Sequence, residues 1–137
     1  IRRRFAPMLE GDGRRIRLAY ALMFSLPGTP VLRYGDEIGM GDDLQLKERE
    51  CARTPMQWTA EKNAGFSKAD RTTMPVIDKG PYGYGHVNVA DQRHDRDSLL
   101  TWMQSVIRLR KETPEIGWGD VTVLDPKERA VLALRYD

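Results

Sequence analysis

The fold is decided by the stretch SLPGTPVLRYGDE, residues 25–37. Its Pro27-Gly28 pair is typical of a helix end, and the apolar and aromatic residues that follow predict a short strand over 29–34. Before this stretch, apolar residues recur at three- and four-residue spacing from 16 to 26. That spacing predicts an amphipathic helix with Asp12 as its N-cap. A helix, a tight turn and a short strand make up half of an α/β repeat.

A long segment without regular periodicity follows, from residue 35 to residue 97. It is dense in Gly, Asp, Asn and Pro, and it carries isolated aromatic residues such as Trp58 and Phe66. Segments of this length are usually functional loops or disordered, and the aromatic residues argue against disorder. We therefore expect a long, mostly ordered loop with short helical turns. Loops that follow the carboxyl ends of strands build the active sites of α/β barrels.

The last part of the chain predicts a helix and then a β-hairpin. The helix begins at Ser98, with Ser98 or Asp97 as its N-cap, and it ends before Pro114. Alternating apolar residues between 121 and 136 predict two strands joined by a type I turn at 125–128. Because a two-stranded hairpin is marginal alone, further sheet is expected in the complete domain.

Composition excludes several classes of protein. The chain has 137 residues, 22 of them basic and 20 acidic, so the net charge of +2 indicates no role in nucleic-acid or membrane binding. The local run Arg2-Arg3-Arg4 is predicted to be a solvated patch. No stretch is apolar enough to be a membrane span. The single cysteine, Cys51, excludes an internal disulfide and favours a reducing, cytoplasmic compartment.

The residues alone give no catalytic pair. Retaining glycosidases need two carboxylates about 5 to 5.5 Å apart, and Asp36-Glu37 is the most suggestive pair. Neighbouring side chains in an extended segment point to opposite faces, so these two would not converge on one bond. Cys51 is not expected to act as a nucleophile, because only His86 and His94 are available as partners.

Metal binding is not predicted either. His86 and His94 are eight residues apart in a loop and lack a companion at a recognised ligand spacing. Acidic loop residues are usually solvated. We therefore expect no calcium site among the acidic residues of the loop, which are Asp36, Asp42, Asp43 and Glu48.

The most informative local motif is RTPMQW, residues 53–58. An arginine beside a rigid proline suits bidentate recognition of a carboxylate or of sugar hydroxyls. Trp58 offers a flat face that either packs in the core or stacks on a sugar ring. The residues alone favour a structural ion pair beside a packed aromatic residue, and a carbohydrate site built on Arg53 is the alternative.

Taken together, these motifs resemble the α-amylase clan of glycoside-active enzymes. SLPGTPVL at 25–32 and YGDEIGM at 34–40 are similar to the last helix and the eighth strand of its catalytic barrel. RTPMQW and NAGFS, at 53–58 and 63–67, narrow the resemblance to α-glucosidase-like and trehalose synthase-like members. Four further segments are most similar to the trehalose synthase branch: IRRRFAPML at 1–9, GMGDDL at 39–44, PVI at 75–77 and VNV at 87–89.

The resemblance implies an α/β fold, with residues 1–113 as the C-terminal portion of a (β/α)8 TIM barrel and residues 114–137 as the start of an antiparallel β domain. It implies a retaining, intramolecular glucosyl transfer that interconverts maltose and trehalose, with maltose, trehalose and glucose as the ligands. The nucleophile, the general acid and the stabilising aspartate of the family precede residue 1, so no catalytic residue is expected in this chain. The alternatives are a hydrolytic α-glucosidase of the same clan and a non-catalytic sugar-binding or structural piece.

The resemblance also assigns residues to the sugar site. Arg53 matches an arginine that binds glucose hydroxyls and pairs with an upstream aspartate. Asp36 and Glu37 match the acidic pair after the eighth strand, of which one touches the second sugar. Gln57 and Trp58 are expected to support the loop. No cofactor or metal is implied for this chain, and a structural calcium ion elsewhere in the parent protein is compatible with the family.

Overall fold

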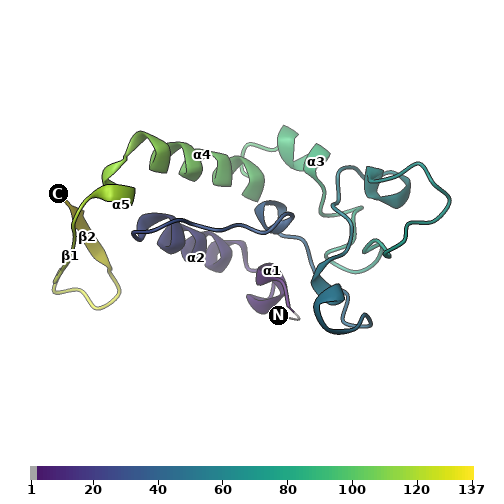
Figure 1. Ribbon diagram of the computed structural model, residues 1–137, viewed down its shortest axis with the longest axis horizontal. Coiled ribbons are helices and arrows are strands. Elements are labelled where there is room, and N and C mark those ends of the chain that lie inside the picture. Colours follow the sequence, from purple (N-terminus) through teal and green to yellow (C-terminus); the bar gives the residue numbers. More distant parts are fainter. Residues whose placement is uncertain (1–2) are drawn as a thin grey trace.

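The computed structural model describes residues 3–137 and places two long helices side by side, with a hairpin at one end and a long loop at the other (Figure 1). The α-helices are α1 (Phe5–Met8), α2 (Gly13–Ser25), α3 (Val89–His94), α4 (Leu99–Glu112) and α5 (Glu115–Trp118). The 3-10 helices are η1 (Asp36–Ile38), η2 (Glu48–Ala52) and η3 (Lys62–Gly65). The strands are β1 (Val121–Leu124) and β2 (Ala133–Tyr136).

Helix α2 forms where the periodicity predicts it. The Asp12 side chain accepts hydrogen bonds from the backbone N–H groups of Arg14 and Arg15, at 2.9 and 3.2 Å. This confirms Asp12 as the N-cap, because the side chain satisfies amide groups that have no partner inside the helix. At the other end, Arg110 of α4 donates to backbone carbonyls at and beyond the last turn, including that of Leu26 at 3.0 Å.

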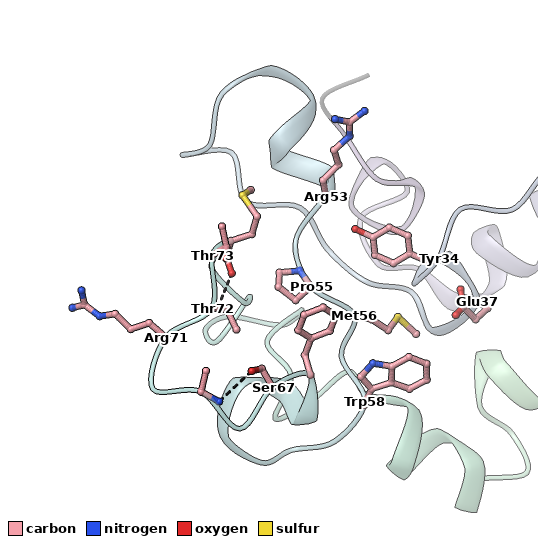
Figure 2. Close-up of a pocket in the computed structure, with 13 residues that line it drawn as sticks. Tyr34, Glu37, Arg53, Pro55, Met56, Trp58, Ser67, Arg71, Thr72 and Thr73 are labelled. Atoms are coloured by element: carbon pink, nitrogen blue, oxygen red, sulfur yellow. Dashed lines mark hydrogen bonds between the residues drawn. The ribbon is translucent and has the colours of Figure 1, made fainter.

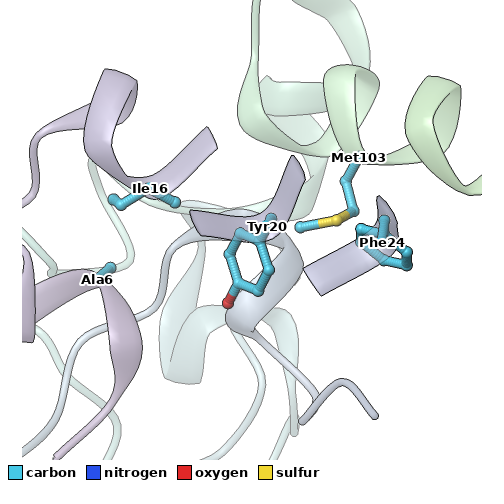
Figure 3. Packing of buried hydrophobic residues seen from close by; sticks show 5 residues of the cluster. All are labelled: Ala6, Ile16, Tyr20, Phe24 and Met103. Carbon is cyan, nitrogen blue, oxygen red and sulfur yellow. The ribbon is translucent and has the colours of Figure 1, made fainter. Parts of the chain in front are cut away.

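The main core lies between α1, α2 and α4 (Figure 3). Ile16, Tyr20 and Phe24 are four residues apart, so they share one face of α2 and are all buried. Met103 of α4 packs on this face and is 1% exposed. Ala6 of α1 belongs to the same buried cluster. Apolar burial of this kind is the main source of stability for a helix pair.

Helix α4 links this core to the loop. The Ser98 side chain accepts a hydrogen bond from the backbone N–H of Thr101 at 3.1 Å, which confirms Ser98 as the cap. The Gln92 side chain of α3 accepts from the Leu100 N–H at 3.0 Å and donates to the Ile38 carbonyl at 2.8 Å. One amide therefore connects α3, α4 and η1. Beside it lies a second apolar cluster of Ile38, Met40, Met56 and Val89.

The predicted strand at 29–34 is absent from the described structure. Residues 29–33 are irregular, and Val31 is 82% exposed. Within residues 3–137 the only paired strands are β1 and β2. A strand is defined by hydrogen bonds to a neighbouring strand. The segment at 29–33 lies beside helix α4 instead, and no described strand pairs with it.

The predicted hairpin is present, but its connection differs. β1 and β2 are antiparallel, with Val121 opposite Tyr136 and Leu124 opposite Ala133, so eight residues join the strands. The predicted type I turn at 125–128 is wrong, because Lys127 has φ +61° where that turn requires a negative value. The Tyr136 hydroxyl donates to the Ser25 carbonyl and ties the hairpin to the end of α2.

Candidate functional site

A cavity of about 720 Å³ lies between the turn at residues 34–37 and the loop at residues 53–74 (Figure 2). Its wall combines aromatic and apolar side chains with two arginines, a carboxylate and hydroxyl groups. A mostly apolar hollow with a few polar groups is the usual form of a small-molecule site. The lining residues are Tyr34, Glu37, Arg53, Pro55, Met56, Trp58, Phe66, Ser67, Ala69, Arg71, Thr72, Thr73 and Met74.

The two adjacent carboxylates at the start of this turn have different surroundings. Gly35 and Gly39 flank η1 with φ +84° and +73°, values that glycine adopts without strain. Within this tight turn, Glu37 lines the cavity. Asp36 does not line it and instead accepts from Arg4 Nη1 at 3.2 Å. The carboxylates therefore have different surroundings and do not form an acid/base pair. The sequence predicted this outcome for an extended segment, whereas both residues lie in the 3-10 helix η1.

The prediction that the N-terminal arginines form a solvated patch is wrong for Arg4. Its side chain is fully buried, lies over the Tyr34 ring with 5.0 Å to the ring centroid, and donates to the Tyr34 carbonyl at 2.7 Å. Arg3 is half-exposed and pairs with Asp42 at 2.8 Å. Arg2 lies outside the described residues. A carboxylate, a carbonyl and an aromatic face partly compensate the buried charge, while Arg4 Nε and Nη2 have no hydrogen-bond partner among the described residues.

Burial sets the ionisation of Asp36. Loss of water around the carboxyl raises its pKa above the usual value of 3.8, and the neighbouring guanidinium of Arg4 partly offsets this effect. The same burial, with Asp36 and Glu37 nearby, raises the pKa of the Tyr20 hydroxyl. The Arg4 guanidinium therefore favours the charged form of the Asp36 carboxyl, whereas burial favours the neutral form.

Arg53 and Trp58 stand at opposite ends of the RTPMQW motif, and both line the cavity. Figure 2 shows the Arg53 guanidinium directed away from Trp58. It pairs with Glu50 at 3.3 Å, and both partners are nearly half exposed. Trp58 is 45% exposed rather than packed in the core. The structure therefore places an exposed ion pair and an accessible aromatic face at the same hollow.

The middle of the motif is a buried scaffold. The Gln57 amide is 0% exposed and donates to the Tyr82 carbonyl at 3.1 Å and to the Val87 carbonyl. Val89 N–H in turn donates to the Gln57 carbonyl at 3.0 Å. These contacts give Gln57 the supporting position expected from the sequence. Tyr34 adds a link between the two cavity walls, because its hydroxyl donates to the Thr54 carbonyl at 3.0 Å.

A left-handed turn behind Trp58 is a feature that sequence reasoning missed. Asn63, Ala64 and Gly65 have φ of +55°, +58° and +67°. The Ala64 carbonyl accepts from the backbone N–H groups of Trp58 and Thr59, at 2.8 and 3.0 Å. Left-handed backbone is costly for alanine. The only sequence signal was the Asn and Gly on either side of Ala64, which favour such turns.

The remaining candidate ligands are dispersed. Among residues 3–137, no group of three or more His, Cys, Asp or Glu side chains could bind a metal ion. Cys51 is buried in η2, where its thiol lies 2.7 Å from the Leu46 carbonyl. In that described range, every helix is too short or too polar to cross a membrane.

Comparison with known proteins defines the class. The model of the "Alpha amylase, catalytic domain" family matches residues 2–119, and the chain belongs to this family. Its fold is part of a (β/α)8 barrel followed by a small antiparallel sheet. The α-amylase of H. orenii superposes with a TM-score of 0.79 and 26% identity, over 99% of this chain and 25% of that one.

Within the family, the chain is similar in sequence to trehalose synthases. It is 47% identical over 135 residues to the trehalose synthase/amylase TreS of Mycolicibacterium smegmatis, covering 97% of this chain and 23% of that protein. It is 45% identical over 136 residues to a trehalose synthase of Thermus thermophilus, covering 97% of this chain and 14% of that protein. The chain therefore spans less than a quarter of the length of these two relatives.

Proposed function

We propose that the full-length protein interconverts maltose and trehalose by a retaining, intramolecular glucosyl transfer, and that this chain supplies one wall of its sugar pocket. The observation that carries the proposal is the cavity itself, in which Glu37, Arg53 and Trp58 surround one hollow. A carboxylate and a guanidinium suit sugar hydroxyls, and an aromatic face suits the apolar side of a pyranose ring. The similarity to trehalose synthases supports this choice of sugars.

The two polar groups have separate roles in the proposal. Glu37 is the member of the acidic pair that contacts the second sugar, because it lines the cavity whereas Asp36 is bound to Arg4. Arg53 binds hydroxyls of the transferred glucose. Its present partner is the exposed Glu50, and such pairs contribute about 0–1 kcal/mol, so exchanging this contact for sugar hydroxyls costs little.

The groups that break the glycosidic bond belong, in this proposal, to other parts of the full-length protein. A retaining mechanism needs two convergent carboxylates, whereas Asp36 and Glu37 diverge. The released glucose must also re-attack before water does, which requires a closed pocket. We therefore expect the 137-residue chain alone to leave maltose unchanged, and turnover by the chain would contradict this assignment.

Product analysis of the full-length protein tests the proposal. Incubation with maltose should yield mainly trehalose, with a smaller amount of glucose. Mainly glucose would instead support the alternative of a hydrolytic α-glucosidase of the same family. Binding of maltose without turnover would support a non-catalytic sugar-binding protein.

The Arg53→Ala variant tests the site. We expect kcat/KM for maltose to fall by roughly 100-fold, as for other lost charged contacts to a substrate. The matched control is Arg129→Ala, which removes an exposed arginine from the hairpin loop, far along the chain from the cavity. An unchanged rate for Arg53→Ala would remove Arg53 from the sugar pocket.

Two further parts of the proposal concern organisation and location. We propose that the barrel portion ends at residue 113 and that residues 114–137 begin a β-rich domain, which limited proteolysis near residue 114 would test.

We also propose a cytoplasmic location, since the single, buried Cys51 requires no oxidising compartment. Fractionation of cells that produce the protein would check this.

A further inference from the structure

Arg4 makes more contacts with the cavity turn than a surface arginine would. Its Nη1 donates to the Tyr34 carbonyl at 2.7 Å and to Asp36 Oδ1 at 3.2 Å. The guanidinium also lies over the Tyr34 ring, 5.0 Å from the centroid. One side chain therefore binds the residue before Gly35 and the residue after it.

The Arg4 guanidinium packs against the backbone of Gly35, where a side chain would not fit. A Cβ atom on Gly35 would lie 2.3 Å from Met40 Sδ and 3.2 Å from Arg4 Nη1, and the φ of Gly35 is +84°. The Met40 N–H closes the turn on the Gly35 carbonyl at 2.9 Å. Arg4 and Met40 therefore pack directly on the bare glycine backbone, so the position of the guanidinium and the shape of the turn are coupled.

Arg4 is itself anchored. Its backbone N–H donates to Asp42 Oδ2 at 2.9 Å, and the same oxygen accepts from Arg3 Nε at 2.8 Å. Asp42 follows the turn by a few residues, so both sides of η1 are tied to the chain at residues 3 and 4. The Arg4–Asp36 pair is largely buried, and solvent therefore screens it less than it screens a surface pair such as that of the half-exposed Arg3.

The cavity depends on this turn for two of its lining side chains. Tyr34 and Glu37 flank Gly35 and Asp36, and both line the hollow. We propose that Arg4 is a positioning residue, which fixes Tyr34 and Glu37 in the cavity wall by binding the Tyr34 carbonyl, the Tyr34 ring and the Asp36 carboxylate. The consequence for sugar binding rests on the proposed function, whereas the effect on the turn does not.

Arg110 provides a matched control. It too donates to backbone carbonyls, namely those of Phe24, Leu26 and Gly28. Arg110 belongs to α4, contacts the end of α2 and does not line the cavity. Loss of Arg110 therefore removes a comparable set of hydrogen bonds without touching the turn at residues 34–37.

The experiment compares Arg4→Met, Arg4→Lys and Arg110→Met in the full-length protein. The first readout is hydrogen exchange of the backbone amides at residues 36–40, which comprise η1 and the two residues after it. This readout is independent of any sugar. We expect exchange there to become about tenfold faster in Arg4→Met, with exchange over residues 14–24 unchanged. Arg4→Lys should be intermediate, because an ammonium group keeps the charge but lacks the planar fork. Arg110→Met should leave residues 36–40 unchanged.

The second readout is the kinetics with maltose. We expect Arg4→Met to raise KM by about tenfold and to change kcat by less than about threefold, because the wall that binds the sugar moves while the bond-breaking groups do not. Unchanged exchange at 36–40 in Arg4→Met and Arg4→Lys, or an equal increase throughout the protein, would overturn the proposed role of Arg4. Faster exchange at 36–40 with an unchanged KM would instead contradict the place of Glu37 in the sugar site.

Discussion

The α2–α4 helix pair and the loop at residues 41–88 are stabilised in different ways. The buried side chains of the pair are apolar or aromatic, as with Phe24 and Met103. In the loop, Gln57 and Asn88 are 0% exposed, and both bind backbone carbonyls. A loop lacks the regular backbone pairing of a helix, and buried amide side chains provide the missing partners. The helix pair therefore packs through apolar side chains, whereas the loop combines buried apolar residues such as Met56 with buried amides that bind its backbone.

The largest expected effect is in the helix pair. Met103→Ala should lower the free energy of unfolding by about 3 kcal/mol, because it leaves a cavity beside the buried face of α2. Leu109→Ala, on the same helix but 60% exposed, should cost much less. Urea denaturation measures both changes, and equal costs would show that α4 does not pack on α2 as described.

A smaller effect is expected in the loop. Gln57→Leu keeps a similar volume but leaves the Tyr82 and Val87 carbonyls without their donor. We expect the free energy of unfolding to fall by about 1.5 kcal/mol, because each carbonyl left without a donor is costly. The cost is limited because the change also removes Gln57 Oε1, a buried acceptor that has no partner among the described residues. Gln45→Leu, at an exposed position, is the control. No loss of stability in urea denaturation would argue that apolar packing alone shapes the loop.

The smallest effect is a pH dependence at the boundary between the two regions. The pKa of Asp36 is raised in the folded protein, so the folded state binds the proton more tightly than the unfolded chain does. The contribution of Asp36 to stability therefore falls as pH rises from the usual value of 3.8 through the raised value. Arg4→Met should raise this pKa further and widen that interval. Titration of the Asp36 carboxyl carbon by NMR measures the shift, and a lower pKa in the variant would contradict the pairing.

The helix pair was readily predicted from sequence, because its signals are local. Periodic apolar residues and the caps Asp12 and Ser98 need no tertiary information. The strand at 29–34 was wrongly predicted because pairing depends on a neighbour that a local pattern does not reveal. α3 was missed because six residues are too few for a clear period.

The site was predicted only in part for the same reason. The sequence assigned Asp36, Glu37 and Arg53 to the sugar site, and the structure brings Glu37 and Arg53, but not Asp36, to one cavity. Trp58, which was expected to support the loop, also lines this cavity. It gave no sign that Arg4 is buried, because an arginine in a basic run looks the same whether it is solvated or packed on Tyr34. Burial of the Arg4 charge depends on partners that are thirty or more residues away.

The most direct test of the account is the KM for maltose of the full-length Glu37→Gln variant. This change removes one charge from the cavity wall and nearly preserves the shape of the side chain. We expect KM to rise by about tenfold or more, as for other lost charged hydrogen bonds, while Glu61→Gln at an exposed loop position leaves it unchanged. An unchanged KM for Glu37→Gln would contradict the central claim that this cavity is one wall of the sugar pocket.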